Sequence, residues 1–335
     1  MRRIFWLLTL CSLARCAGAA RLAPKPIRVV VAADGSGDYR TVQQAMDHAP
    51  DNAQGERRLI VAIKPGVYFG RVSIPRDRPR VTLLGLGARP QDTVLTYNMS
   101  ARRAGGTFFS STVDVEGRGF EAVNLTIANS FGPGSQAVAL SLHAGRVVLD
   151  RCRLLGYQDT LYAASGAQYY RDCYIQGAVD FIFGNAAAVF DHCRIAAIGR
   201  GYITAQSRRS PAASTGFVFY RCRIAGPRVG PGAFLGRPWR RCSRVVYLDC
   251  YLGRGLRRVG WDDWRNPAIQ RTAWYGEYGS TGPGARSARR SAWAHALTPR
   301  QAREFFPRKF FAARSWQLWP AWARLQKIAA AAGAR

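Results

Sequence analysis

Residues 148–154, Val-Leu-Asp-Arg-Cys-Arg-Leu, carry the pattern that decides the fold of this chain. A short apolar run is followed by two mostly polar residues, then by a cysteine, a polar residue and an apolar residue. The same pattern returns four times, around Cys173, Cys193, Cys222 and Cys250. Residues 120–127 read as a cysteine-free copy, in which Leu125 takes the cysteine position. Short strand-like segments therefore recur at one phase of a repeating unit.

The spacing of these copies predicts a solenoid. The cysteines are separated by 21, 20, 29 and 28 residues, so two short units precede two longer ones. Alternation of polar and apolar residues indicates half-buried strands, and such units bury their apolar face only by stacking on one another. We predict an all-β parallel β-helix with the cysteines as an inward ladder. A β-sandwich also has short strands at regular intervals, but the recurrence of one residue type at one phase favours the solenoid.

Two motifs place an aspartate at the same phase of the repeat. Residues 156–162 (GYQDTLY) contain Asp159, and residues 177–184 (GAVDFIFG) contain Asp180; each aspartate lies seven residues after a cysteine. In a solenoid the two would lie on adjacent strands, about 4.8 Å apart. Two carboxylates this close cannot both ionise easily, which raises one pKa and supplies an acid near neutral pH. The alternative, a pair of turn-capping aspartates, would leave the motifs around them without a role.

The N-terminal residues predict export. Arg2 and Arg3 precede an apolar stretch, residues 4–13, and residues 17–19 (AGA) form a small-residue cleavage site. Residues 1–19 are therefore predicted to be a secretory signal peptide, because a stretch this short cannot span a bilayer, which needs about 20 apolar residues. We expect a protein without a membrane anchor, secreted to the extracellular space and the cell wall.

The charge of the chain predicts an anionic partner. The formal net charge is +29, and loss of Arg2, Arg3 and Arg15 with the signal peptide would leave +26. A charge this large favours adhesion to polyanions. Because the chain is exported and shows no nucleic-acid module, an acidic extracellular polysaccharide is the expected partner and nucleic acid is not. Much of this arginine also fits a solvated surface without a specific role.

Cysteines and sequons give two further expectations. Five of the six cysteines outside the signal peptide lie on the ladder, where reduced thiols act as apolar filler; pairing between stacked neighbours is left open. Asn98 and Asn124 begin Asn-x-Ser/Thr sequons, the acceptor pattern for N-glycosylation. With Leu125 pointing inward, Asn124 is expected to face outward and to be accessible, which would make the chain a glycoprotein.

Further motifs follow in a fixed order. Besides the two aspartate motifs they are residues 136–140 (QAVAL), 203–206 (ITAQ), 235–239 (LGRPW) and 276–284 (GEYGSTGPG). This set resembles the pectinesterases (pectin methylesterases), particularly the plant type, from residue 27 to about residue 316. The resemblance implies a right-handed, single-stranded parallel β-helix with a few short helices near the termini. It also implies a carboxylic ester hydrolase that removes methyl esters from galacturonate units of pectin and releases methanol.

The resemblance implies roles for five catalytic residues. Asp180 would attack the ester carbonyl, while Asp159 would protonate the leaving methanol and then activate the water that clears the acyl-enzyme. Arg237 would pair with Asp180 and hold it charged. Gln136 and Gln158 would donate hydrogen bonds to the tetrahedral oxyanion. The residues expected to bind substrate are Trp239, Phe183, Thr107 and Tyr162, although a tyrosine beside a site, Tyr162 or Tyr157, more often serves strand packing.

The same resemblance divides the chain into a signal peptide (1–19), a catalytic β-helix domain (20–316) and a C-terminal tail (317–335). The tail is expected to be a short helix that packs on the coil or is disordered. An inhibitor-like N-terminal pro-region, frequent in the family, is not expected. One position departs from the family pattern: Gly70 stands where a glutamate is usual.

Rival functions are less well supported. The four histidines lie outside the motifs, no Gly-x-Ser-x-Gly elbow is present, and no ligand-spaced His/Cys set predicts zinc, so no cofactor is expected. The expected partners are methyl-esterified pectin and a proteinaceous pectinesterase inhibitor, and a monomer is expected. Two alternatives stay open: a retaining glycosidase, which also uses paired acids about 5 Å apart, and an inactive wall-binding protein.

Overall fold

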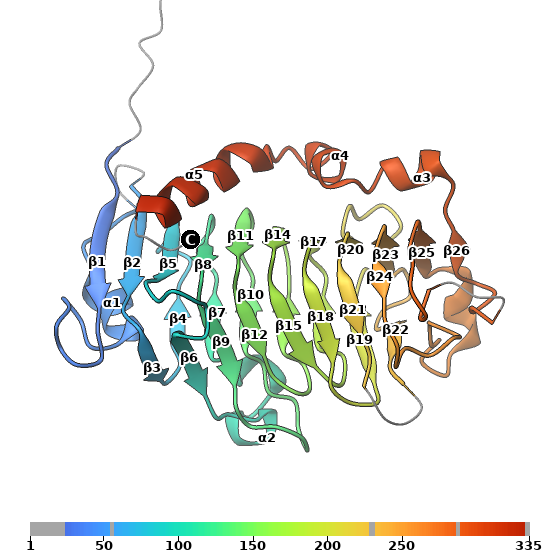
Figure 1. Cartoon of the computed structure of the whole chain (residues 1–335), viewed down its shortest axis with the longest axis horizontal. Helices are drawn as coiled ribbons and strands as arrows, with labels where there is room; N and C mark the ends of the chain where they lie inside the picture. Colours follow the sequence, from blue (N-terminus) through green and yellow to red (C-terminus); the bar gives the residue numbers. More distant parts are fainter. Residues whose placement is uncertain (1–23, 54–56, 228–231, 286–288, 332–335) are drawn as a thin grey trace, which may run out of the picture.

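The computed structural model describes residues 24–53, 57–227, 232–285 and 289–331. The predicted signal peptide lies outside these ranges. Within them the chain winds into a coil whose strands follow one another along the long axis of the molecule (Figure 1). Along the middle of the coil each full turn adds one strand to each of three parallel sheets, which we name A, B and C. This confirms the predicted right-handed parallel β-helix.

Among the described residues, sheet A has eleven strands in sequence order. They are β1 (Ile27–Val31), β2 (Leu59–Ile63), β5 (Val81–Gly85), β8 (Glu121–Val123), β11 (Val147–Asp150), β14 (Ala167–Arg171), β17 (Ala187–Asp191), β20 (Gly216–Tyr220), β23 (Arg244–Leu248), β25 (Trp274–Tyr278) and β26 (His295–Ala296). The eight described strands of sheet B are β3 (Gly66–Phe69), β6 (Thr93–Tyr97), β9 (Thr126–Asn129), β12 (Arg153–Leu155), β15 (Tyr174–Gly177), β18 (Arg194–Ala197), β21 (Arg223–Ala225) and β24 (Tyr251–Leu252). The seven of sheet C are β4 (Val72–Ile74), β7 (Val113–Val115), β10 (Leu140–Leu142), β13 (Leu161–Ala163), β16 (Ile182–Gly184), β19 (Tyr202–Gln206) and β22 (Phe234–Pro238).

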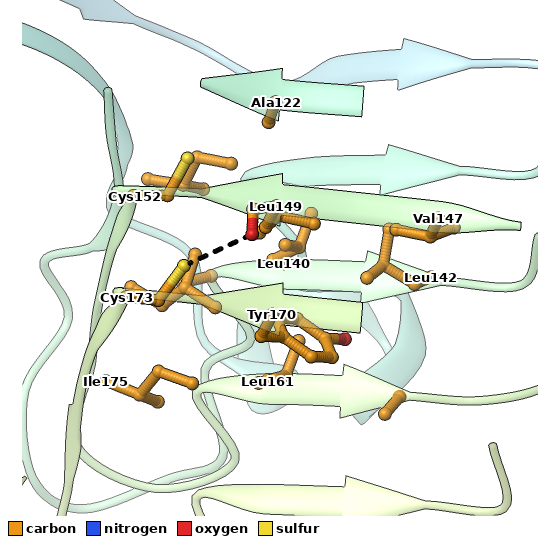
Figure 2. Packing of buried hydrophobic residues seen from close by; sticks show 14 of the residues in the cluster. Ala122, Leu140, Leu142, Val147, Leu149, Cys152, Leu161, Tyr170, Cys173 and Ile175 are labelled. Atoms are coloured by element: carbon orange, nitrogen blue, oxygen red, sulfur yellow. Dashed lines mark hydrogen bonds between the residues drawn. The ribbon is translucent and has the colours of Figure 1, made fainter. Parts of the chain in front are cut away.

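The cysteines form the predicted ladder between sheets A and B. Cys152 and Cys173 lie buried on neighbouring turns, and the Cys173 thiol donates to the Leu149 carbonyl oxygen at 3.7 Å (Figure 2). The amide of Arg153 donates to Leu125 O at 2.9 Å, which places Leu125 in the ladder as expected. All six described cysteines are free thiols. Burial raises the pKa of Cys152 and Cys173 well above the usual value, so these thiols are unreactive filler.

An aromatic stack runs beside the cysteines on the inner face of sheet A. Tyr170, Phe190, Phe219 and Tyr247 are register partners on four successive strands, and their ring centroids lie 4.6, 4.6 and 4.5 Å apart. Offset ring stacking adds to the free energy gained by burying this large apolar area. The repeat is therefore held in register by stacked side chains as well as by backbone hydrogen bonds.

One prediction about Asn124 is wrong. Its side chain is 1% exposed and its amide nitrogen donates to the carbonyl oxygens of Gly85 and Gly87 at 3.2 and 2.7 Å. The position before each ladder residue is a turn in the left-handed region rather than an outward strand position: φ is 53° at Asn124, 51° at Arg151 and 50° at Asp172. Asparagine adopts this conformation readily, and here it folds inward, so it is no glycosylation site. Asn98 is exposed.

The helices lie along the ends and one side of the coil. They are α1 (Val42–His48), α2 (Ala101–Ala104), α3 (Pro299–Arg303), α4 (Pro307–Ala312) and α5 (Leu318–Ala331), with 3-10 turns η2 (Thr107–Phe109) and η3 (Pro267–Arg271). Short helices near the termini were expected. Helix α2 and turn η2 are an exception, because they lie away from both termini, between β6 of sheet B and β7 of sheet C.

The C-terminal tail packs on the coil, which was one of its two expected states. Helices α3, α4 and α5 follow sheet A along its length (Figure 1). Leu325 of α5 is fully buried in a cluster that includes Val123 and Val148 of sheet A. The Arg324 guanidinium forms a 2.6 Å ion pair with Glu121, which also contacts the half-buried Arg58 at 3.2 Å.

This packing predicts that shortening a buried side chain of α5 lowers the stability of the chain. We expect Leu325→Ala to lower the free energy of unfolding by about 2–4 kcal/mol, because it leaves a cavity against sheet A. Trp319→Ala, at an exposed position of the same helix, is the matched control and should cost less. Urea denaturation monitored by circular dichroism measures both. Equal losses in the two variants would show that α5 is not docked through Leu325.

Candidate active site

A cavity of about 260 Å³ opens on the outer face of sheet C. Its lining residues come from η2, from the turns that precede the sheet C strands, and from the strands themselves: Thr107, Phe108, Gln136, Gln158, Asp159, Asp180, Phe183, Ala205, Arg237, Trp239 and Trp264. The structure therefore brings together all five predicted catalytic residues. The lining also contains three of the four predicted substrate-binding residues. The fourth, Tyr162, lies behind the lining.

Asp159 and Asp180 occupy equivalent turns just before β13 and β16. The amide of Asp159 donates to Val179 O at 3.1 Å, and both aspartates have positive φ, 64° and 48°. A glycine precedes each aspartate by three residues. A Cβ on Gly156 would lie 2.6 Å from the Thr160 hydroxyl, and one on Gly177 would lie 2.2 Å from Phe181 Cβ. These glycines let each turn close tightly enough to present its carboxyl group to the cavity.

Arg237 reaches Asp180 from two strands away. Its Nε and Nη2 donate to the two carboxylate oxygens at 2.9 and 2.6 Å, a bidentate geometry that is among the stronger charge-assisted contacts. The guanidinium lies between the rings of Tyr202 and Trp264, 3.8 and 3.6 Å from their centroids. These rings hold the guanidinium plane and shield the ion pair from water.

Ala205 makes room for this contact. Phe183, Ala205 and Arg237 are register partners on β16, β19 and β22, so Ala205 lies between the arginine and the Asp180 side of the cavity. It is buried and lines the cavity. A larger side chain at this position would stand in the path of the guanidinium.

A substitution at Ala205 tests this geometry. We expect Ala205→Leu to lower kcat/KM on methylated pectin by about 100-fold, because displacing a catalytic group by about 1 Å has an effect of this size. Ala225→Leu, at an exposed position of sheet B, is the control and should keep wild-type activity. Steady-state methanol release measures both. An active Ala205→Leu variant would show that the reach of Arg237 does not depend on a small residue here.

The two carboxyl groups differ in electrostatic environment. Burial raises the pKa of Asp159 well above its usual value, and the neighbouring charge of Asp180 raises it further. The pKa of Asp180 is also raised by burial, but the Arg237 hydrogen bonds and charge oppose this. Over the interval between the two pKa values, Asp180 is ionised while Asp159 keeps its proton. Burial is the largest cause of the raised pKa of Asp159, ahead of the like charge of Asp180 on which the sequence-based expectation relied, and the Arg237 contact sets the pKa of Asp180 apart from it.

Gln136 and Gln158 line the cavity as half-buried residues. Their backbone carbonyl oxygens accept from Ala101 N at 2.8 Å and Ala137 N at 3.1 Å, which fixes the main chain at both positions. Among the described residues, no other group hydrogen-bonds either side-chain amide. Both amides are therefore available to donate to a group bound in the cavity.

Aromatic rings form one wall of the site. Phe183 packs against Trp239 with ring centroids 6.0 Å apart. Tyr162 stacks on Phe183 at 4.7 Å and packs against Phe108 in a tilted arrangement at 4.8 Å, so it supports the wall from outside the cavity lining. Flat apolar faces of this kind suit the C–H faces of a sugar ring.

Sequence reasoning missed several residues of this site. Phe108 and Trp264 line the cavity, and Tyr202 contacts Arg237, yet none was predicted to take part. Trp264 has a φ of 58° in a turn and is 37% exposed. Its only signal in the sequence is an aromatic residue within a polar turn segment, residues 262–267 (DDWRNP). Such a residue is a common binding feature but does not reveal what it contacts.

The unusual Gly70 has a structural explanation. It follows β3 with a φ of 135°, a conformation that side-chain-bearing residues rarely adopt, and a Cβ there would meet no atom within 4 Å. The backbone conformation rather than crowding therefore disfavours a glutamate. Gly70 does not line the cavity.

Two further observations concern the described part of the chain as a whole. No helix within it is both long and apolar enough to cross a membrane. Nor do the described histidine, cysteine, aspartate and glutamate side chains gather into a group of three or more that could hold a metal ion.

The chain is similar to known proteins along most of its length. The family model described as Pectinesterase matches residues 28–314. Pectinesterase 31 of Arabidopsis thaliana is 42% identical over 293 residues, which are 84% of this chain and 91% of that protein. Pectinesterase 2.2 of Solanum lycopersicum is 38% identical over 86% of this chain, but the matched region is only 54% of that protein.

A solved structure agrees with the fold and with the family. The pectin methylesterase from carrot superposes with a TM-score of 0.80 at 36% sequence identity, covering 86% of this chain and 94% of the carrot chain. On the strength of the family model, the relatives and this structure, the chain belongs to the pectinesterase family.

Proposed function

We propose that this chain hydrolyses the methyl esters of galacturonate units in pectin, releasing methanol and leaving pectate. One observation carries the proposal: Arg237 holds the Asp180 carboxyl group by two hydrogen bonds in the same cavity as Asp159, whose pKa burial raises well above its usual value. A nucleophile and an acid thus share one cavity with two free amide donors. Ester hydrolysis needs these three functions.

The first half-reaction transfers the acyl group to the protein. An Asp180 oxygen attacks the ester carbonyl carbon, and the carbonyl oxygen becomes a tetrahedral oxyanion. Gln136 and Gln158 donate to this oxyanion, a contribution worth roughly 100- to 1000-fold in rate for each donor. As the C–O bond to the methoxy group breaks, Asp159 gives its proton to the leaving oxygen. Methanol leaves, and an acyl-enzyme anhydride on Asp180 remains.

The second half-reaction restores the protein. Asp159, now ionised, takes a proton from a water molecule that attacks the acyl carbon, and the same amide donors stabilise the second oxyanion. The tetrahedral intermediate collapses with Asp180 as leaving group. Galacturonic acid leaves and gives its proton to solvent, while Arg237 again holds the ionised Asp180 and Asp159 again carries a proton.

Substrate binding follows from the wall of the cavity. Trp239 and Phe183 would face a sugar ring, Thr107 offers a hydroxyl group in the cavity lining, and Tyr162 supports Phe183. The proposal extends to the setting of the enzyme: export after removal of residues 1–19, retention in the cell wall by the positive charge, action as a monomer, and control by a proteinaceous inhibitor. The catalytic unit would comprise residues 20–316.

The pH dependence follows from the two carboxyl groups. Activity needs Asp180 ionised and Asp159 protonated, so kcat/KM should rise as pH passes the lower apparent pKa of the pair and fall as it passes the higher one. Because burial raises the pKa of both groups, we expect the plateau above the ordinary range of carboxyl groups. Initial rates of methanol release across pH test this, and an optimum below about pH 4 would contradict it.

Product analysis distinguishes the proposal from its alternatives. The purified chain is incubated with highly methylated pectin, and both methanol and new reducing ends are measured. We expect methanol without reducing ends. New reducing ends would identify a glycosidase. If neither product forms while the folded protein still binds pectin, the chain is a binding protein.

A further inference from the structure

A row of arginines and tyrosines lies on the outer face of sheet B. Arg153, Tyr174, Arg194, Arg223 and Tyr251 are register partners on the successive strands β12, β15, β18, β21 and β24. These strands lie side by side along the coil (Figure 1). With strands about 4.8 Å apart, the row is about 19 Å long. We name Arg153, Arg194 and Arg223 the arginine ladder.

The guanidinium groups of the arginine ladder are available to a ligand. Arg194 and Arg223 are exposed and Arg153 is half-buried. In the part of the chain that the structure describes, none of the three forms an ion pair with a carboxylate. Arg153 lies over the Tyr174 ring at 5.4 Å and Arg223 over the Tyr251 ring at 4.6 Å. Stacking orders these guanidinium groups and leaves their N–H donors pointing to solvent.

Fold stability does not account for the row. Arg194 and Arg223 are directly opposite each other on neighbouring strands, and like charges in this arrangement are destabilising. Single exposed arginines elsewhere on the surface carry no such cost. A line of unneutralised cations along a straight sheet instead matches a linear partner with regularly spaced negative charges.

A cavity of about 540 Å³ adjoins the arginine ladder at its N-terminal end. Its charged and aromatic lining consists of Arg89, Arg151, Arg153, Arg194, Asp172 and Tyr174. Asp172 is the one carboxylate in the lining, and it is paired with Arg171 at 3.2 Å. Arg89 and Arg151 are also paired, with Asp92 at 3.4 Å and Asp150 at 3.0 Å. Arg153 and Arg194 therefore supply the unpaired positive charge of this concave start to the linear track.

We propose that the arginine ladder and this cavity form a second polysaccharide site, which binds a run of free carboxylates on de-esterified galacturonan. The proposal rests on the proposed function, because methyl-ester hydrolysis generates these carboxylates. Methylated stretches are uncharged and lack the group that the guanidinium groups bind. The site therefore binds the product of the reaction in preference to the substrate. It holds the enzyme on blocks that have already been de-esterified, while the cavity on sheet C acts elsewhere on the polymer.

Binding to fully de-esterified polygalacturonate tests the proposal. The ladder variant carries Arg153→Gln, Arg194→Gln and Arg223→Gln. A control variant with the same net charge carries Arg28→Gln, Arg300→Gln and Arg303→Gln, all at exposed positions away from sheet B. At low ionic strength we expect the ladder variant to bind about tenfold more weakly than wild type, from three exposed ion pairs, and the control less than twofold. The difference should shrink as salt screens the charges.

Three results would overturn the proposal: equal weakening in both variants, wild-type affinity in the ladder variant, or an equal loss of affinity for fully methylated pectin. Methanol release from a short methylated oligogalacturonate, which cannot span both sites, should be unchanged in the ladder variant. If the wild type binds polygalacturonate through the ladder but releases no methanol, the site stands and the esterase does not. Should the triple variant fail to fold, Arg223→Gln alone, expected to bind about twofold more weakly, gives the same comparison.

Discussion

Asp180→Asn is expected to lower kcat for methanol release by at least about 10⁴-fold, as loss of a nucleophile does in other acyl-transfer enzymes. The amide keeps the shape of the carboxylate, so the variant should fold and still bind methylated pectin. What it loses is the negative charge that Arg237 holds at 2.6 and 2.9 Å and the oxygen that attacks the ester. Steady-state methanol assays measure the loss.

Asp77→Asn is the control for this change. Asp77 is an exposed aspartate in the turn after β4, outside the lining of the cavity. We expect wild-type rates from it. If Asp180→Asn keeps more than a small percentage of the wild-type activity, Asp180 is not the nucleophile. Equal losses of activity in both variants would indicate a general effect on folding.

Asp159→Asn should have the second-largest effect, a loss of about 10²- to 10⁴-fold in kcat, the usual range for a general acid and base. The variant can neither protonate methanol nor activate water. Because its amide does not titrate, the limb of the pH profile that reflects the higher apparent pKa should disappear. A variant with near wild-type rates and an unchanged pH profile would exclude Asp159 as the acid.

Asp159→Asn lowers activity, but it should make the folded chain more stable than the wild type as pH rises. Burial raises the pKa of Asp159 in the folded chain, so the folded state loses stability as pH rises from the unfolded value, about 3.9, through the raised one. Asparagine does not ionise and escapes this loss. The free energy of unfolding of Asp159→Asn should therefore exceed that of the wild type increasingly as pH rises over this interval. Urea denaturation at several pH values measures the difference, and a constant difference would contradict the assignment.

Much of this fold could be predicted because the sequence repeats itself. A cysteine at one phase of each unit fixes the inward face, and any residue a constant distance later must stack on its counterpart. That is why Asp159 and Asp180 could be placed on adjacent turns. In a solenoid, residues at the same sequence distance from successive ladder cysteines lie next to one another, whatever insertions separate the units.

The positions that could not be predicted lie where the backbone leaves the strand period. Asn124 precedes a ladder residue, so alternation placed it outward, but the chain turns there with a φ of 53° and buries the side chain. Strand periodicity does not describe a left-handed turn. The six successive copies of this turn all have positive φ, so the error at Asn124 applies to the position rather than to one residue.

The surroundings of Arg237 were unpredictable for a different reason. Tyr202 comes from the preceding sheet C strand and Trp264 from a turn between β24 and β25, so their contact with the guanidinium depends on tertiary packing. Ala205 belongs to a recognised motif, but only the register of β16, β19 and β22 shows that its small size opens a path. The packing of Leu325 on sheet A likewise required the position of α5.

The central claim is that Asp180 forms a covalent acyl-enzyme, and partitioning between two acceptors tests it most directly. Methyl and ethyl esters of one oligogalacturonate are hydrolysed in the presence of hydroxylamine, and the ratio of hydroxamate to acid is measured. Both esters form the same acyl-enzyme after the alcohol leaves, so the account predicts the same ratio from both. A ratio that depends on the leaving alcohol would show that water and hydroxylamine attack the ester directly, without Asp180 as nucleophile.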